Sequence, residues 1–180
     1  MKKIIKKRSV KSGKPPGTLI HIGEQMGAAV SIRVIEYDAD HFEERLLENL
    51  SAFVPIEKPL RVTWINIVGL HQVEVLDQLG ACYGIHPLVL EDILNTDQRP
   101  KVEEGEDSLC FILKSLAATA DSAELSMEQV SIVLGRQFVI SFLEADDRIF
   151  EPVVDYLKTG KGRIRKSGPD YLAYALLDAV

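Results

Sequence analysis

Two neighbouring acidic side chains, Glu91 and Asp92, are the residues of this sequence best suited to bind a metal ion. Carboxylate oxygens are the ligands that hard divalent cations such as Mg²⁺ prefer. Both residues follow Pro87, which is typical of a first helical turn. Adjacent residues of a helix do not face each other, so the two carboxylates cannot easily hold one ion together. Each needs a partner from another element or another copy of the chain; otherwise the pair is ordinary surface charge.

A third candidate carboxylate, Asp178, lies close to the end of the chain in a predicted last helix. The sequence contains no Gly-x-Ser-x-Gly, no Gly-x-x-x-x-Gly-Lys-Ser/Thr and no His-Glu-x-x-His pattern. His86 directly precedes a predicted helix, so it is expected to cap that helix or pack in the turn. The three acidic residues have no accompanying nucleophile or base, and the sequence therefore predicts a protein that is not an enzyme.

The charge is distributed unevenly along the chain. Seven of the 21 Lys and Arg residues fall within residues 1–14, and the first acidic residue is Glu24. We expect residues 1–17 to form a mobile basic arm and residues 18–180 to form one folded, acidic domain. An acidic domain argues against nucleic acid as a partner, because binding the phosphate backbone needs clustered positive charge. The two cysteines, Cys82 and Cys110, lie among apolar residues and are expected to be buried, reduced thiols.

Hydrophobic periodicity predicts the elements that must position these residues. Helices are expected at residues 40–50, 72–83, 86–95 and 149–158, and from residue 169 onward. Strands are expected at residues 29–37, 61–68, 108–116, 128–134 and 138–143, the last two joined by a hairpin. Helices that alternate with strands, followed by antiparallel strands, indicate an α/β fold with a mixed parallel and antiparallel sheet covered by helices.

The last predicted helix has a start signal at Pro169 but no stop signal before Val180. We therefore expect the domain to end inside a longer helix. Apolar runs in the sequence are far shorter than the ~20 residues needed to cross a bilayer. Asp92 is expected to be dispensable for folding, because the apolar residues around it supply the packing of its helix.

Several segments closely resemble the soluble domain of the CorA family of magnesium and cobalt transporters. The hallmark is residues 84–95, GIHPLVLEDILN, which continues to QRPK at residues 98–101. Further matching segments follow in the right order at residues 128–131 (EQVS), 162–165 (GRIR) and 170–178 (DYLAYALLD). Together they extend over most of the chain from Trp64 to Val180.

The resemblance implies a homopentamer in the cell (inner) membrane, with this αβα domain on the cytoplasmic side as part of a funnel. It implies a stalk helix and two membrane helices beyond Val180. It also implies that Mg²⁺ is both the transported ion and a regulatory ion. The regulatory Mg²⁺ binds between neighbouring funnels and holds the channel closed. By motif position, Asp92 corresponds to an acidic residue of that sensor, and Glu91 and Asp178 to a second site nearby.

Ion preference stays open, with Co²⁺ and Ni²⁺ as further candidate ions. A zinc-handling paralogue with a related funnel is the nearest alternative. A free-standing cytosolic protein that binds or senses metal is a second one, although the unfinished last helix argues against it.

Overall fold

A computed structural model describes residues 13–23, 30–50, 61–118, 125–145 and 148–180. The strands in these ranges form one seven-stranded sheet in the order β2-β1-β3-β7-β6-β5-β4. Within it, the central pair β3–β7 is parallel and the other neighbouring pairs are antiparallel. The bounds are β1 Ser31–Tyr37, β2 Phe42–Leu47, β3 Val62–Val68, β4 Lys101–Glu104, β5 Leu109–Ala118, β6 Leu125–Leu134 and β7 Phe138–Leu143.

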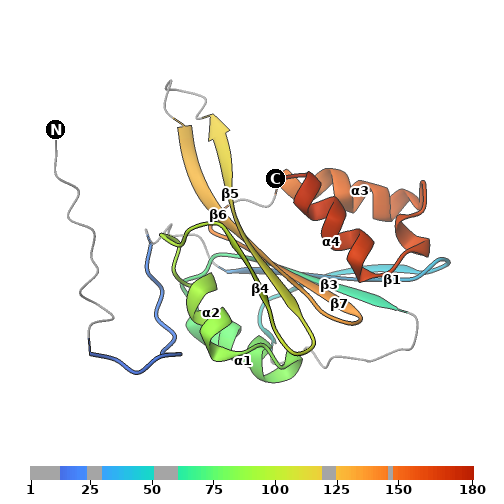
Figure 1. The fold of residues 1–180 in the computed structure, drawn as a ribbon. Coiled ribbons are helices and arrows are strands. Elements are labelled where there is room, and N and C mark those ends of the chain that lie inside the picture. The colour runs from blue at the N-terminus through green and yellow to red at the C-terminus, as the bar shows by residue number, and fades with distance from the viewer. Residues whose placement is uncertain (1–12, 24–29, 51–60, 119–124, 146–147) are drawn as a thin grey trace.

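Helices cover both faces of the sheet (Figure 1). Helices α1 (Val73–Tyr83) and α2 (Pro87–Ile93) lie on one face, and α3 (Glu151–Thr159) and α4 (Pro169–Asp178) lie on the other. Two short 3-10 turns, η3 (Arg148–Phe150) and η4 (Ile164–Lys166), flank α3. The predicted α/β fold, a mixed sheet between layers of helices, is confirmed.

The sheet separates two hydrophobic cores, because successive side chains of a strand point to opposite faces. On β3, Ile65 and Ile67 belong to the core under α1 and α2, whereas Val62 and Trp64 belong to the core under α3 and α4. The central strands are buried on both faces and read as nearly continuous apolar runs, as expected for strands covered on both sides.

Helix α1 turns into α2 through a short connection that the sequence signals predict. Gly84 has a φ of +65° and its backbone N–H bonds to the Gly80 carbonyl, which ends α1 as a left-handed cap. Pro87 then opens α2, and Nδ1 of His86 accepts a hydrogen bond from the Leu88 N–H at 3.2 Å. The prediction that His86 caps this helix is confirmed.

The predicted helix at residues 40–50 is wrong: Phe42–Leu47 form the edge strand β2, paired antiparallel with β1. Asp38 closes the hairpin, since its Oδ1 accepts hydrogen bonds from the N–H groups of Asp40 and His41. The sequence is rich in Glu, Arg and Leu, which favour helices. Pairing with the free edge of β1, supported by cross-strand ion pairs such as Arg45 with Glu36, overrides that preference.

The expectation about the cysteines is met only in part. Cys110 is buried as predicted, whereas Cys82 is exposed because it lies on the solvent side of α1. Residues 1–12 of the predicted arm lie outside the described residues. Within the described ranges, every helix is too short or too polar to cross a membrane.

Candidate metal-binding site

Helix α2 presents the predicted site residues at the surface. Its buried residues Leu90 and Ile93 pack into the core shared with α1, so the intervening Glu91 and Asp92 are left partly exposed. Both carboxylates line an open groove of about 1810 Å³. Six acidic residues line this groove against three Lys and Arg residues, so it attracts cations.

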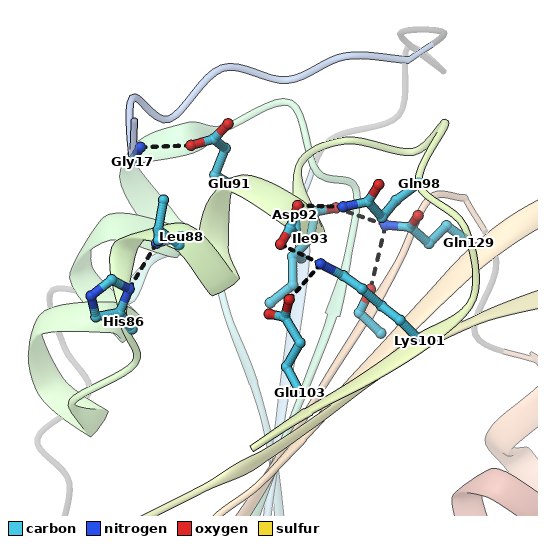
Figure 2. A network of polar contacts seen from close by, with 11 residues as sticks. Gly17, His86, Leu88, Glu91, Asp92, Ile93, Gln98, Lys101, Glu103 and Gln129 are labelled. Atoms are coloured by element: carbon cyan, nitrogen blue, oxygen red, sulfur yellow. Dashed lines mark hydrogen bonds and ion pairs between the residues drawn. The ribbon is translucent and has the colours of Figure 1, made fainter. Parts of the chain in front are cut away.

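The Asp92 carboxylate is held by two side chains from the segment that follows α2 (Figure 2). Its Oδ2 accepts from Nζ of Lys101 at 2.6 Å, and its Oδ1 accepts from Nε2 of Gln98. The Asp92 side chain is 22 % exposed. It therefore links α2 to β4, and the expectation that Asp92 takes no part in the fold overlooked this ion pair.

Lys101 also binds Glu103, whose Oε1 lies 2.6 Å from Nζ. Lys101 and Glu103 are alternate residues of β4 and point to the same face of the sheet. Their β5 partners in the register are Ile112 and Cys110, both in the core under α2. Partial burial acts to lower the pKa of Lys101, but the bonds to Asp92 and Glu103 outweigh it and raise that pKa above its ordinary value.

The buried thiol of Cys110 lies beneath this group and responds to its charge. The pKa of Cys110 is raised to about 12, mainly by burial and then by the carboxylates of Glu103 and Asp92, while the ammonium of Lys101 opposes them. The group of Asp92, Lys101 and Glu103 combines two carboxyl groups with one amine. A site of this kind favours a cation over an anion.

A buried polar network fixes the C-terminal end of α2 against the sheet. Gln129 on β6 is fully buried, and its Nε2 donates to the Ile93 carbonyl at 2.9 Å. Lys114 on β5 donates from Nζ to the Thr96 carbonyl at 2.5 Å. The bond from Gln129 satisfies a carbonyl that the helix end leaves without an intrahelical partner, and the bond from Lys114 fixes the segment that follows the helix. The position of Asp92 is therefore set by the sheet.

Glu91 has a different partner. Its Oε2 accepts a hydrogen bond from the backbone N–H of Gly17 at 2.6 Å (Figure 2). Gly17 also lies close to Pro87, because a Cβ on Gly17 would come within 3.3 Å of the Pro87 Cβ. The segment before residue 18 therefore contacts α2 at Gly17, and Glu91 is its anchor.

Asp178 lies away from the other two candidates. It is exposed in the last turn of α4, on the opposite face of the sheet from α2. Within one chain, Asp178 therefore cannot share an ion with Glu91 or Asp92, and such an ion would have to bridge two copies. Across the described ranges, no cluster of three or more His, Cys, Asp or Glu side chains is arranged to hold a metal.

Sequence reasoning missed Gln98, Lys101 and Glu103 as neighbours of Asp92. Gln98 and Lys101 fall within the QRPK segment that carries the family resemblance, but their contact with Asp92 requires the chain to turn back after α2. The strand β4 that positions Lys101 and Glu103 was not predicted. The alternation of Lys101, Val102 and Glu103 was the available signal for a short edge strand.

Comparison with known proteins identifies the family. The family model described as "CorA-like Mg2+ transporter protein" matches residues 60–180. The chain is 40 % identical over 175 residues to the "Cobalt/magnesium transport protein CorA" of Thermotoga maritima, covering 97 % of this chain and 50 % of that protein. The chain thus spans half the length of that relative.

Solved structures share the fold. The soluble domain of CorA from Methanocaldococcus jannaschii superimposes with a TM-score of 0.59 at 17 % identity, covering 81 % of this chain and 54 % of that one. The cytoplasmic domain of ZntB from Vibrio parahaemolyticus gives 0.61 at 14 % identity, covering 82 % and 57 %. The family match extends over two thirds of the sequence and includes the segment that carries Glu91 and Asp92. This chain therefore belongs to the CorA-like Mg²⁺ transporter family, a family of metal-ion transporters rather than enzymes.

Proposed function

We propose that this chain is the cytosolic regulatory domain of a divalent-cation transport channel, and that it senses intracellular Mg²⁺ through acidic residues shared between copies. The observation that carries the proposal is the Asp92 carboxylate, which is held at the rim of an acidic groove and already binds a cation, the Lys101 ammonium. Family membership supports Mg²⁺ and Co²⁺ as the transported ions.

The donor set fits Mg²⁺ as the regulatory ion. Asp92 offers hard carboxylate oxygens and is accessible from the groove. Mg²⁺ dehydrates reluctantly and usually keeps several waters, so it is bound through one or two carboxylates. A site with so few protein ligands binds weakly, which suits a sensor of an abundant cytosolic ion. Co²⁺ and Ni²⁺ accept the same oxygen ligands and remain candidates.

The assembly that we propose is a homopentamer in the inner membrane, with this domain on the cytoplasmic side. In this assembly an ion shared by Asp178 and Glu91 would bridge two chains, because α4 and α2 lie on opposite faces of the sheet (Figure 1). An ion that bridges two copies favours the closed arrangement only through its higher affinity for that arrangement.

The experiment is to replace Asp92 with Asn in the full-length transporter and to measure Mg²⁺ uptake into proteoliposomes at graded internal Mg²⁺. We expect the internal concentration that silences transport to rise about tenfold, within the usual range of coupling between sites. Asp77→Asn is the matched control, because Asp77 is exposed on α1 and away from the Lys101 contact. An unchanged Mg²⁺ dependence in Asp92→Asn would contradict the proposal.

The same variant must remain folded for this result to have meaning. Asparagine keeps an oxygen that can accept from Lys101 or Gln98, and Lys101 keeps its pairing with Glu103. The free energy of unfolding should therefore fall by about 1 kcal/mol or less, as for other partly exposed ion pairs. Thermal unfolding of the isolated domain measures this.

A zinc-handling function is the alternative that the fold leaves open, because the ZntB domain matches as well as the CorA domain. Uptake of Zn²⁺, Mg²⁺ and Co²⁺ measured in the same proteoliposomes separates the two. A chain that functions as a free-standing sensor would support no uptake of any of these ions.

A further inference from the structure

The strongest feature beside the groove, beyond the predicted ligands, is the position of the Lys101 ammonium between two residues that line it. Nζ lies 2.6 Å from Asp92 Oδ2 and 2.6 Å from Glu103 Oε1, between a carboxylate of α2 and a carboxylate of β4 (Figure 2). All three side chains are partly exposed, at 28 % for Lys101, 22 % for Asp92 and 38 % for Glu103. The ammonium is therefore a cation bound by two oxygens in contact with the groove.

The fold sets this arrangement on both sides. Gln98 holds the second oxygen of Asp92, and Gln129 fixes the end of the helix that carries Asp92. On β4, the alternation of the strand turns Lys101 and Glu103 to the same face. The ammonium of Lys101 lies at the end of a flexible four-carbon side chain. Among Asp92, Lys101 and Glu103, Lys101 is therefore the residue that can move.

A divalent ion that binds Oδ2 of Asp92 would share that oxygen with the Lys101 ammonium. An ammonium and a metal ion bound to one carboxylate oxygen would lie within a few ångströms of each other, and like charges at that distance repel strongly. The ammonium must therefore move away from Oδ2 of Asp92 for a divalent ion to bind there.

We propose that Lys101 is an internal competitor for the divalent cation at Asp92. The ammonium occupies Asp92 and Glu103 when no divalent ion is bound, and it leaves Asp92 when the ion binds. Glu103 then keeps Lys101 paired, so that no charge is left without a partner. The competition lowers the affinity of the site and thereby sets the ion concentration to which it responds. This inference rests on the proposed role of Asp92 as an ion ligand.

The test uses Mn²⁺ as a paramagnetic probe of the 180-residue chain, followed by the broadening of backbone amide signals in NMR spectra. We compare the parent with Lys101→Met, which removes the ammonium and keeps an unbranched side chain, and with Lys101→Arg, which keeps the charge. Broadening near residues 92 and 103 should begin at about tenfold lower Mn²⁺ in Lys101→Met. In Lys101→Arg it should begin at about the parent concentration.

Lys158→Met is the matched control for charge. Lys158 forms a similar ion pair with Glu44, 2.9 Å apart, on the face of the sheet covered by α3. Its removal changes the net charge equally but should leave broadening near residue 92 unchanged. If broadening near residue 92 begins at equally low Mn²⁺ in Lys101→Met and Lys158→Met, the effect is one of general charge, and the proposal that Lys101 competes with the ion is wrong. Lys101→Gln, neutral but still able to donate to both carboxylates, replaces Lys101→Met if the latter does not fold.

The double variant Lys101→Met/Asp92→Asn separates this inference from the proposed function. If broadening in the double variant no longer begins at the lower Mn²⁺ concentration seen in Lys101→Met, the result supports competition at Asp92. Broadening in Lys101→Met that is no stronger than in the parent would overturn the competition, while the uptake test of Asp92→Asn would still stand. If broadening in the double variant still begins at that lower Mn²⁺ concentration, Asp92 is not the ligand, and both proposals would then fail.

Discussion

Replacing Gln129 by methionine, which has nearly the same shape, removes the buried amide that bonds to the end of α2. The Nε2 group of Gln129 donates to the Ile93 carbonyl at 2.9 Å, and the residue is fully buried. Leaving a buried acceptor without a partner costs about 1–3 kcal/mol. The apolar methionine side chain recovers part of this, so we expect a loss of about 2 kcal/mol from a total of about 5–15 kcal/mol.

Thermal and urea unfolding of the isolated domain measure this loss. For a domain of this size, about 2 kcal/mol lowers Tm by about 4–8 °C. Gln78→Met is the matched control, because Gln78 is exposed on α1 and should change Tm little. If the two variants have the same Tm, the bond from Gln129 to α2 contributes nothing, and the claim that the sheet sets the position of Asp92 is refuted.

Two further predictions concern buried polar groups. Ser141→Ala should lower the free energy of unfolding by about 1–3 kcal/mol, because the Trp64 indole N–H donates to Ser141 Oγ at 2.9 Å and would lose its buried partner; unchanged Tm and Trp64 emission would count against this. Burial, and then the nearby Glu128, raise the pKa of Glu144 above its ordinary value despite opposing hydrogen bonds, so ionised Glu144 costs stability at neutral pH. The parent should therefore gain stability relative to Glu144→Gln as pH falls from 7 toward about 4.3, the pKa of a Glu side chain in the unfolded state. Urea midpoints of parent and variant that change equally with pH would refute this.

Local signals predict much of the fold around the site. Gly84 and Pro87 mark the end of α1 and the start of α2 through backbone preferences that need no tertiary contact. The β-branched run of β3 predicts a strand buried on both faces, and Gly135 between two apolar runs predicts the β6–β7 hairpin. Of these elements, α2 carries Glu91 and Asp92, so the exposure of the two carboxylates was within reach of the sequence.

The failures have a common physical cause, because each depends on a partner distant from the residue in question. Residues 42–47 have helix-favouring composition and become a strand only because β1 offers them a free edge. The segment of residues 101–104 is short and charged, as suits an edge strand. It becomes β4 only through pairing with β5. The ion pair of Asp92 with Lys101 depends on β4, and therefore it could not be predicted without that strand.

The internal partners of the acidic residues decide how an ion could act on this domain. In the single chain, Glu91 binds the Gly17 backbone and Asp92 binds Lys101 and Gln98. An ion that takes either carboxylate must break such a contact, so its binding is an exchange of partners rather than the filling of a vacant site. Exchange lowers the net affinity, because the energy of the lost contact is subtracted from that of the new one. Exchange also carries the effect of ion binding to other parts of the chain, since loss of the Glu91 contact frees the segment at Gly17 and loss of the Asp92 contact frees Lys101 on β4. Under the proposed function, ion binding at α2 would thereby be coupled to the segment at Gly17 and to β4.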